Sequence, residues 1–493
     1  PADGLGMPLC LGMPLFGTVP VQADLKQICS SLHTGSAAID TLTPIGRGQS
    51  MLLLGERGTG KSSLARDTML AQALAGGDAM HCVLALSDGG IEAASAQLDW
   101  IAARVPASLL ARTCVVATER RGAAEATLTA AAACAIGERV RDSGGHALVV
   151  LDELSGHLAL WEEGARLLEL DAGGRTSVRP AEHAAEQRAF YAALLQRAAQ
   201  LSDERGGGSL TLLAIVEELP QCSSRDGQIN PEKTYAMSDF DRHPLKQQQR
   251  VAALLQRGIK LDIEALSRIG IPPPMTEGRS ELSSIGGAAD AHATRAQHID
   301  QLKSLADGHI QLHRHLFEAG CRPALEPAES LGRVGVGSDA TMRPVPSSDA
   351  MMLLAPSLRL ELAQARDLPT GELDEFRMMQ RVRTKALVRA LSSQQEGQPK
   401  SLAEQIVVLL ALIDGRLDSI AHTTLAEASI KLDAFVSRVR SLAPAAMHAV
   451  DASQQLSADS RAALAHAMAT ALPSSKRTRA LFVNWDRGES TRS

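Results

Sequence analysis

Four residues in the first part of the chain have the types and spacing that bind a phosphate group. Residues 50–66 read SMLLLGERGTGKSSLAR, in which Gly55, Gly60, Lys61 and Ser62 fit the pattern G-x-x-x-x-G-K-[ST]. Glycines at these positions let backbone N–H groups approach an anion, and the N-terminus of the following helix points at it. We expect Lys61 to reach the outer phosphates of a nucleotide and the Ser62 hydroxyl to ligate Mg²⁺. A chance match is the alternative, but an apolar run before the motif and a helix-forming run after it favour a nucleotide site.

Carboxylates that would serve such a site follow two other apolar runs. HALVVLDELS (146–155) places Asp152 where a strand would end, and a carboxylate there can orient Mg²⁺ and its waters. Hydrolysis also needs a residue that polarises water, and the candidate is Asp88 in CVLALSDGG (82–90). Asp88 is one methylene shorter than glutamate and two glycines follow it, so we expect it not to be catalytic. Glu92 is an alternative base.

Short apolar runs alternate with helical stretches in the part of the chain around these residues. Such alternation predicts a mainly parallel sheet covered by helices on both faces, which is an α/β fold. The runs occupy residues 51–54, 82–86, 113–118, 147–152 and 210–217. After about residue 340 the pattern is helical, and Ser401 with Glu404 forms a capping box before the apolar run of SLAEQIVVLLALIDGRL.

The composition excludes several classes of protein. The chain has 493 residues, 45% of them hydrophobic and 22% charged, which is ordinary for two or three globular domains. A net charge of −6 argues against a nucleic-acid partner. Seven cysteines without C-x-x-C pairs indicate a reducing compartment, and no apolar stretch is long enough for direct membrane insertion.

The order of several sequence blocks is similar to that of one family. TGSAAIDTLTPIGRGQSMLLLGERGTGKSSLARDTMLAQ (34–72) resembles the approach to the phosphate loop in the alpha subunit of the F-type rotary ATP synthase. LVVLDELSGHL, LFEAGCRPALEPAESLGRVG and AEQIVVLLALIDGRLD continue the resemblance in the family's order. The resemblance extends from about Thr34 to Leu442. It implies a RecA-like P-loop NTPase core followed by an all-helical C-terminal domain.

The resemblance assigns a role to individual residues. It implies that a phosphate-binding turn is formed by Arg57, Gly58, Thr59, Gly60, Lys61, Ser62 and Ser63. Ser62 and Asp152 would hold Mg²⁺, and the ATP base would lie among Phe317, Arg322, Pro323 and Gln398. Arg333 in ESLGRVG matches the arginine that alpha subunits offer in trans to the neighbouring beta subunit.

The implied function is that of a noncatalytic subunit. Alpha subunits hold Mg-ATP without the catalytic glutamate of beta subunits, and they alternate with beta subunits in a hexamer around the central stalk gamma subunit. The implied setting is proton-driven ATP synthesis at the mitochondrial inner membrane, on the matrix side, with a plastid or bacterial membrane as the alternative. Peripheral stalk subunits would be further partners. Two other functions stay open: a catalytic P-loop ATPase with its own active site, and a structural paralogue that has lost nucleotide binding.

The chain departs from the family in three respects. We expect residues 1–46 to be a linker after a missing N-terminal β-barrel, which would be a separate polypeptide or a part that was cut off. Residues 47–345 would form the nucleotide-binding domain, with an insertion at about 222–301 that is a candidate docking surface, and residues 346–493 the helical domain. We take LADGHIQLHRHLF (305–317) as the strand after the insertion, with His313 and His315 alternating along it. Gly58 stands where the family commonly has glutamine.

Overall fold

The computed structural model describes residues 14–17, 19–28, 30–74, 79–87, 90–118, 123–154, 180–218, 287–333, 358–359, 362 and 375–472. The chain divides into two compact units, of which the smaller comprises residues 218–298. The elements described below belong to the larger unit, apart from the first part of one helix, α10 (Gly287–Leu305).

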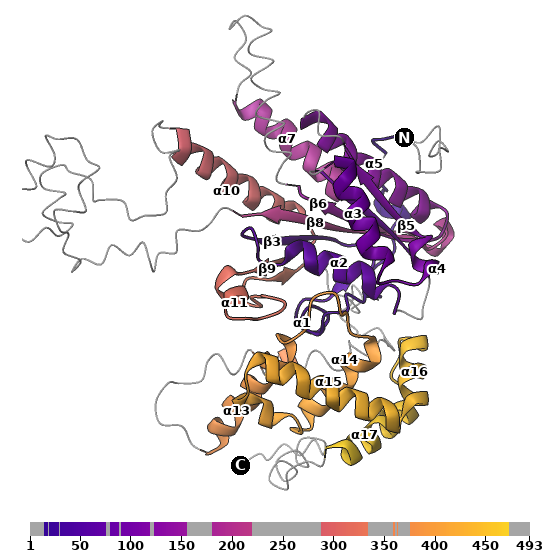
Figure 1. The fold of residues 1–493 in the computed structure, drawn as a ribbon. Coiled ribbons are helices and arrows are strands. Elements are labelled where there is room, and N and C mark those ends of the chain that lie inside the picture. Colours follow the sequence, from indigo (N-terminus) through magenta and orange to yellow (C-terminus); the bar gives the residue numbers. More distant parts are fainter. Residues whose placement is uncertain are drawn as a thin grey trace, which may run out of the picture. The chain divides into compact units, whose positions relative to one another are not determined.

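A mainly parallel sheet forms the centre of the larger unit (Figure 1). Its strands lie in the order β10-β9-β3-β8-β6-β4-β5, and β7 pairs with β8. The parallel members are β3 (Ser50–Gly55), β4 (Met80–Leu86), β5 (Thr113–Ala117), β6 (His146–Asp152), β8 (Ser209–Glu217) and β9 (Gly308–Leu312). β7 (Ala199–Gln200) and β10 (Leu331–Gly332) are antiparallel to their neighbours. The five predicted strands and the α/β fold are thereby confirmed.

Side chains of each strand alternate between two hydrophobic clusters, one on each face of the sheet. Met51 and Leu53 of β3 belong to one cluster, and Leu52 and Leu54 belong to the other. This alternation follows from the two-residue period of a strand. The first face is covered by α1 (Ala37–Leu42), α2 (Lys61–Ala71), α3 (Gly90–Ala102) and α4 (Ala107–Leu110). The second is covered by α5 (Ala123–Asp142), α7 (Pro180–Leu195) and the part of α10 from Ile299 onward.

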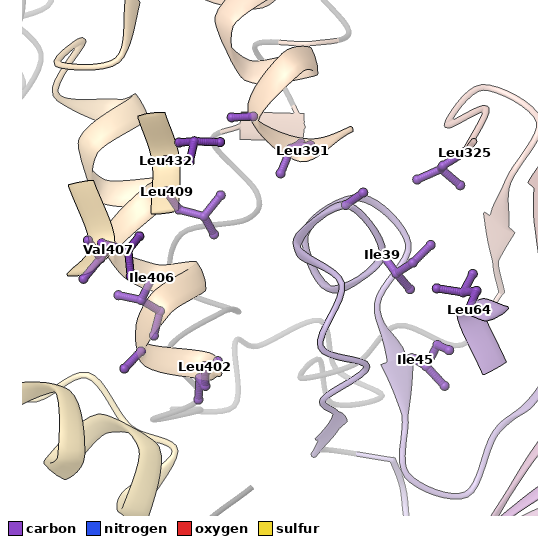
Figure 2. Packing of buried hydrophobic residues seen from close by; sticks show 14 of the residues in the cluster. Ile39, Ile45, Leu64, Leu325, Leu391, Leu402, Ile406, Val407, Leu409 and Leu432 are labelled. Atoms are coloured by element: carbon purple, nitrogen blue, oxygen red, sulfur yellow. The ribbon is translucent and has the colours of Figure 1, made fainter. Parts of the chain in front are cut away.

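Helices of the C-terminal region extend the first of these clusters. They are α13 (Glu375–Leu391), α14 (Leu402–Ile413), α15 (Leu425–Leu442), α16 (Pro444–Ser453) and α17 (Ala458–Ala471). Figure 2 shows Leu402, Ile406 and Leu409 of α14 as members of the cluster that also contains Ile39 and Leu64. The capping box of Ser401 and Glu404 is confirmed at the start of α14. The apolar runs predicted as helices therefore pack together because each carries one buried face.

The strand predicted at 305–317 is present but shorter than expected. β9 begins at Gly308 and ends at Leu312, and His313 is the N-cap of a short helix, α11 (Arg314–Glu318). His315 therefore lies in a helix, so the prediction that His313 and His315 alternate along one strand is wrong. In this helix the Phe317 N–H donates a hydrogen bond to the His313 carbonyl at 3.1 Å, within the ordinary range for such bonds.

Most of the predicted insertion lies outside the described residues. The described part of 222–301 begins at Gly287 and belongs to α10. The proposed domain boundaries at residues 46 and 345 stay predictions.

Candidate functional site

The phosphate loop joins a buried strand to the N-terminus of a helix. β3 lies between β8 and β9, so all its residues are buried, and it ends at Gly55. α2 begins at Lys61 after a turn in which Gly58 and Gly60 have φ angles of +80° and +89°. These left-handed conformations favour glycine, because a β-carbon would crowd the backbone there. The turn thus directs its backbone N–H groups and the start of α2 toward the same side.

Lys61 connects the start of α2 to the end of β3. Its Nζ donates hydrogen bonds to the carbonyl oxygens of Gly55, at 2.8 Å, and of Glu56, at 2.7 Å. The Thr59 hydroxyl donates to the same Glu56 carbonyl at 2.9 Å. Lys61 is buried, with 7% of its surface exposed. A buried ammonium beside a positive helix terminus makes this loop a strong anion-binding element.

Ser62 and Asp152 meet although 90 residues separate them. The Ser62 hydroxyl donates to Oδ1 of Asp152 at 3.3 Å. Asp152 is the last residue of β6, which is separated from β3 by β8 alone, so both side chains reach the carboxyl edge of the sheet. Burial raises the pKa of Asp152, and the Ser62 hydrogen bond and the charges of Arg66 and Lys61 oppose this only in part. A hydroxyl and a carboxylate are the hard oxygen ligands that Mg²⁺ prefers.

A cavity that is partly open to solvent adjoins the phosphate loop. Phe317, Arg322 and Pro323 line it together with Thr59 and Gly60. The Arg322 guanidinium lies over the Phe317 ring, 3.4 Å from its centroid, and its Nη1 donates to the Phe317 carbonyl at 2.7 Å. The two side chains hold each other in place and present a flat wall. The structure therefore brings together the predicted base-pocket residues Phe317, Arg322 and Pro323 with the phosphate loop.

The segment before α14 also lines this cavity, but with other residues than expected. Gln394, Gln395 and Glu396 are lining residues. Gln398 is exposed and is not among the described residues that line the cavity. Its backbone N–H donates to the Gln395 carbonyl at 3.4 Å, in a turn that carries it away from the lining positions.

Asp67 of α2 is a further lining residue that sequence reasoning missed. Its position two helical turns after the loop is visible in the sequence, yet nothing there shows which face of α2 borders a cavity.

Arg57 is exposed at the turn, whereas Ser63 is half-buried beside the cavity. The Arg57 carbonyl accepts a hydrogen bond from Arg314 at 2.8 Å, and Arg314 also pairs with Glu56 at 3.0 Å. Ser63 lines the cavity next to Gly60. The turn is thus fixed by α11 from outside and by Lys61 from inside.

Arg333 lies beside the edge strand β10, away from the carboxyl ends of the parallel strands where the phosphate loop lies. It follows β10, in which Gly332 pairs with Gly308 at the start of β9. Leu312 at the end of β9 pairs with Gly55, next to the phosphate loop. The start of β9, beside Arg333, is therefore four residues from its end, beside the phosphate loop, which is about 13 Å along the strand. Arg333 is exposed, and its Nη1 donates to the Ser304 carbonyl at 2.7 Å.

Of the two candidate bases for hydrolysis, Glu92 belongs to the described residues and Asp88 does not. Asp88 lies outside the described residues. Glu92 is exposed in the first turn of α3. The end of β4 is next to β6, because the Ser87 N–H donates to the Asp152 carbonyl at 2.8 Å.

The fold and the site together define a class of protein. A parallel sheet with a phosphate loop after a central strand, and a carboxylate at the end of a strand two positions away, is the core of a P-loop nucleotide-binding protein. A bundle of helices after that core completes the arrangement. None of the helices in the described ranges is long and apolar enough to cross a membrane.

Comparison with known proteins gives the family. Residues 35–221 match the family described as ATP synthase alpha/beta family, nucleotide-binding domain. The chain is 30% identical over 428 residues to ATP synthase subunit alpha of Lawsonia intracellularis, covering 85% of this chain and 66% of that protein. It is 29% identical over 447 residues to the subunit alpha of Dehalococcoides mccartyi, covering 83% of this chain and 67% of that protein. It is also 29% identical over 451 residues to that of Aquifex aeolicus, covering 87% of this chain and 71% of that protein. The chain therefore belongs to the ATP synthase alpha/beta family, and the resemblance to alpha subunits is confirmed.

The aligned part spans about two thirds of the length of these relatives, with 66% for the Lawsonia protein. The three relatives are bacterial, so they give no support to the expected mitochondrial location.

Proposed function

We propose that the chain is a noncatalytic nucleotide-binding subunit of an ATP synthase head, and that Arg333 acts in the catalytic site of a neighbouring beta subunit. The first part of the proposal concerns the chain's own site. The second concerns the adjacent subunit.

The chain's own site has the parts that bind a nucleotide. The loop offers backbone N–H groups, a helix N-terminus and the buried ammonium of Lys61 to the phosphates. The cavity beside the loop offers the Phe317 ring and Pro323 to a base. ATP is the ligand that the family resemblance implies.

Ser62 and Asp152 fit Mg²⁺ chemically. Their oxygen atoms already approach to 3.3 Å, and a cation would favour the ionised form of a carboxylate whose pKa burial has raised. Mg²⁺ bound there would neutralise phosphate charge. The residues of this chain would orient it.

The position of Arg333 is the observation that carries the second part. Arg333 lies about 13 Å along the strands from the chain's own phosphate loop, so its guanidinium serves no role in the cavity described above. It is exposed at an edge strand, and one of its five N–H donors is engaged with Ser304. A guanidinium placed in this way is suited to the γ-phosphate of a neighbour, where such a group typically accelerates transfer by about 10³ to 10⁵.

The test compares Arg333→Ala with Lys61→Ala in a complex reconstituted with beta and gamma subunits. We expect Arg333→Ala to lower ATP hydrolysis by about 10³ or more, while the nucleotide bound to this chain is retained. Lys61→Ala should release that nucleotide and leave the chemical step in the beta subunit largely intact. Arg333→Lys is the matched control, because lysine keeps the charge without the planar fork and should restore little activity.

Three results would contradict the proposal. Full activity of the Arg333→Ala complex would exclude the arginine finger. Rapid ATP hydrolysis by the isolated chain, lost on substitution of Asp88 or Glu92, would establish the catalytic alternative. A purified chain in which mass spectrometry finds no nucleotide would favour the structural paralogue.

The remaining partners and the location are part of the same proposal. We infer an alternating hexamer with beta subunits around gamma, contacts with the peripheral stalk, and a place in proton-driven ATP synthesis at a membrane. Cell fractionation followed by identification of every co-purifying polypeptide would distinguish a mitochondrial from a plastid or bacterial membrane. It would also detect a separate barrel polypeptide.

A further inference from the structure

The segment 392–398, between α13 and α14, is attached to both sides of the cavity beside the phosphate loop. On the side of the base pocket, the Gln394 N–H donates to the Arg322 carbonyl at 3.1 Å. On the side of α2, the Gly397 N–H donates to Oδ1 of Asp67 at 2.9 Å. The segment therefore connects the residues expected at the base with the helix that begins at the phosphate loop.

Glu396 lies in the middle of this segment and contacts the first two turns of α2. The Ser63 hydroxyl donates a hydrogen bond to Oε1 of Glu396 at 2.5 Å. Nη2 of Arg66 lies 3.4 Å from the same oxygen and donates to the Ser63 hydroxyl at 3.2 Å. One carboxylate oxygen thus engages a hydroxyl and a guanidinium near the start of the helix.

The same two donors are suited to a phosphate oxygen. Ser63 is the third residue of α2, in the turn where backbone N–H groups and the positive end of the helix dipole attract anions. It lines the cavity together with Gly60, so an anion at its hydroxyl lies beside the phosphate loop. A carboxylate and a phosphate carry charge of the same sign, and both accept hydrogen bonds. The two groups therefore exclude each other from these donors.

We propose that Glu396 competes with the phosphates of the nucleotide for Ser63 and Arg66, and that nucleotide binding detaches the segment 392–398 from the start of α2. The inference rests on the nucleotide site proposed above and adds to it a residue that lowers its affinity. Because this segment joins α13 to α14, its release transmits occupancy of the site to the C-terminal helices.

Trp100 of α3 is placed to report this change. The Arg66 guanidinium lies over its ring, 4.9 Å from the centroid, and the Arg104 guanidinium lies 4.3 Å from it. A β-carbon on Gly397 would lie 3.7 Å from Cζ2 of the same ring. The ring is therefore beside both the arginine that Glu396 engages and the segment that carries Glu396. Detachment of the segment changes the surroundings of the ring, and hence its fluorescence.

The first experiment is calorimetric titration of the full chain with Mg-tripolyphosphate and with Mg-ATP. Mg-tripolyphosphate has no base, so its affinity reports competition for the phosphate donors alone. Glu396→Gln should raise the affinity for both ligands about tenfold, because a neutral acceptor holds the two donors less strongly than a carboxylate and does not repel phosphate. Glu396→Ala removes the acceptor and should raise the affinity for Mg-tripolyphosphate at least as much.

Asp67→Asn is the matched control. It removes a carboxylate from the same cavity wall, and its amide oxygen keeps an acceptor for the Gly397 N–H. The Ser63 hydroxyl stays engaged with Glu396, so the affinity for Mg-tripolyphosphate should rise about twofold or less. An equal rise in Asp67→Asn and Glu396→Gln would assign the effect to the general charge of the wall and overturn the inference.

The second experiment follows the fluorescence of Trp100 in a chain whose other two tryptophans, Trp161 and Trp485, are replaced by phenylalanine. Saturating Mg-tripolyphosphate should shift the emission of this chain. Glu396→Ala should produce most of the same shift before the ligand is added. An emission spectrum that neither the ligand nor the substitution changes would contradict detachment of the segment.

The outcomes separate the inference from the nucleotide site itself. Wild-type affinity for Mg-tripolyphosphate in both Glu396 variants would overturn the inference and leave the site standing. A loss of Mg-ATP affinity alone would also overturn it, by showing that Glu396 serves the base. Failure of the wild-type chain and of both Glu396 variants to bind either ligand, or equal binding by Lys61→Ala, would overturn the proposed site and the inference with it.

Discussion

At the scale of single residues, the phosphate loop depends on two glycines whose surroundings differ. Gly58 and Gly60 both have left-handed φ angles, which cost an L-residue about 1 kcal/mol. A β-carbon on Gly58 would meet no atom within 4 Å. A β-carbon on Gly60 would lie 3.3 Å from Cε2 of Phe317. Gly60 is therefore restricted by both its conformation and the cavity wall, whereas Gly58 is restricted by conformation alone.

We predict that Gly60→Ala weakens binding of Mg-tripolyphosphate about tenfold more than Gly58→Ala does. The shared backbone cost cancels in this comparison, so the difference reports the contact with Phe317. Calorimetric titration of both variants measures it. Equal affinities would show that the Phe317 ring moves aside without effect on the loop.

At the scale of elements, two helices of the C-terminal bundle both begin with a capping box, one in a buried and one in an exposed environment. Ser401 caps α14 and Thr424 caps α15, each in a complete capping box. Ser401 is buried, and its hydroxyl also bonds the Asp451 carboxylate, whose pKa burial raises. Thr424 is exposed. The cap of α14 thus has an additional, half-buried partner, which also accepts a hydrogen bond from the Ala403 N–H at 2.8 Å.

We predict that Ser401→Ala lowers the free energy of unfolding by about 1 to 2 kcal/mol, and that Thr424→Ala lowers it by about 1 kcal/mol or less. Urea denaturation of the two variants provides the measurement. A larger loss for Thr424→Ala would mean that Asp451 finds another donor when the Ser401 hydroxyl is removed.

At the scale of the molecule, one buried polar network joins the segment before the phosphate loop to the C-terminal helices. His33 Nδ1 lies 3.0 Å from Oδ2 of Asp40, and Gln405 of α14 donates to the same oxygen at 2.9 Å. His33 Nε2 bonds the Lys400 carbonyl at 2.9 Å, and Gln72 donates to the His33 carbonyl at 2.8 Å. The nucleotide-binding core and the helices therefore share one charged pair in their common interior.

The network should make stability depend on pH. Burial lowers the pKa of His33, but the Asp40 charge, the hydrogen bond to Asp40 and that to Lys400 outweigh it, so the pKa is raised above its ordinary value of 6.5. The native state then binds more protons than the unfolded state from pH 6.5 upward. The stabilisation is complete below pH 6.5 and is lost as the pH rises through the native pKa.

We predict that the free energy of unfolding falls as the pH rises above 6.5 through the native pKa of His33, and that His33→Gln abolishes this decrease. Denaturation curves at several pH values measure it. His422→Gln, at an exposed position, is the control and should keep the wild-type slope. The same slope in His33→Gln would assign the pH dependence to other groups.

The sequence alone determined the elements and the phosphate loop, because both depend on local patterns. Apolar runs of strand length predict strands, and Gly55, Gly60, Lys61 and Ser62 carry a motif that forms from adjacent residues. The sequence also predicted that Ser62 and Asp152 lie near each other, because the carboxyl ends of parallel strands meet at one edge of the sheet. The positions of Phe317, Arg322 and Pro323 at the cavity were expected from the family resemblance, and not from the pattern of residues.

Tertiary structure decided what depends on side chains that are distant in the chain. It brought Asp67 and Glu396 into one wall, and placed Gln394 rather than Gln398 at the cavity, because a turn of a few residues sets which side chains face inward. It ended β9 at Leu312 and put His315 in a helix. It also placed Arg333 at the edge of the sheet away from the chain's own loop. How deeply a side chain is buried, which group it contacts and which way it points are properties of the packed molecule, and local sequence does not encode them.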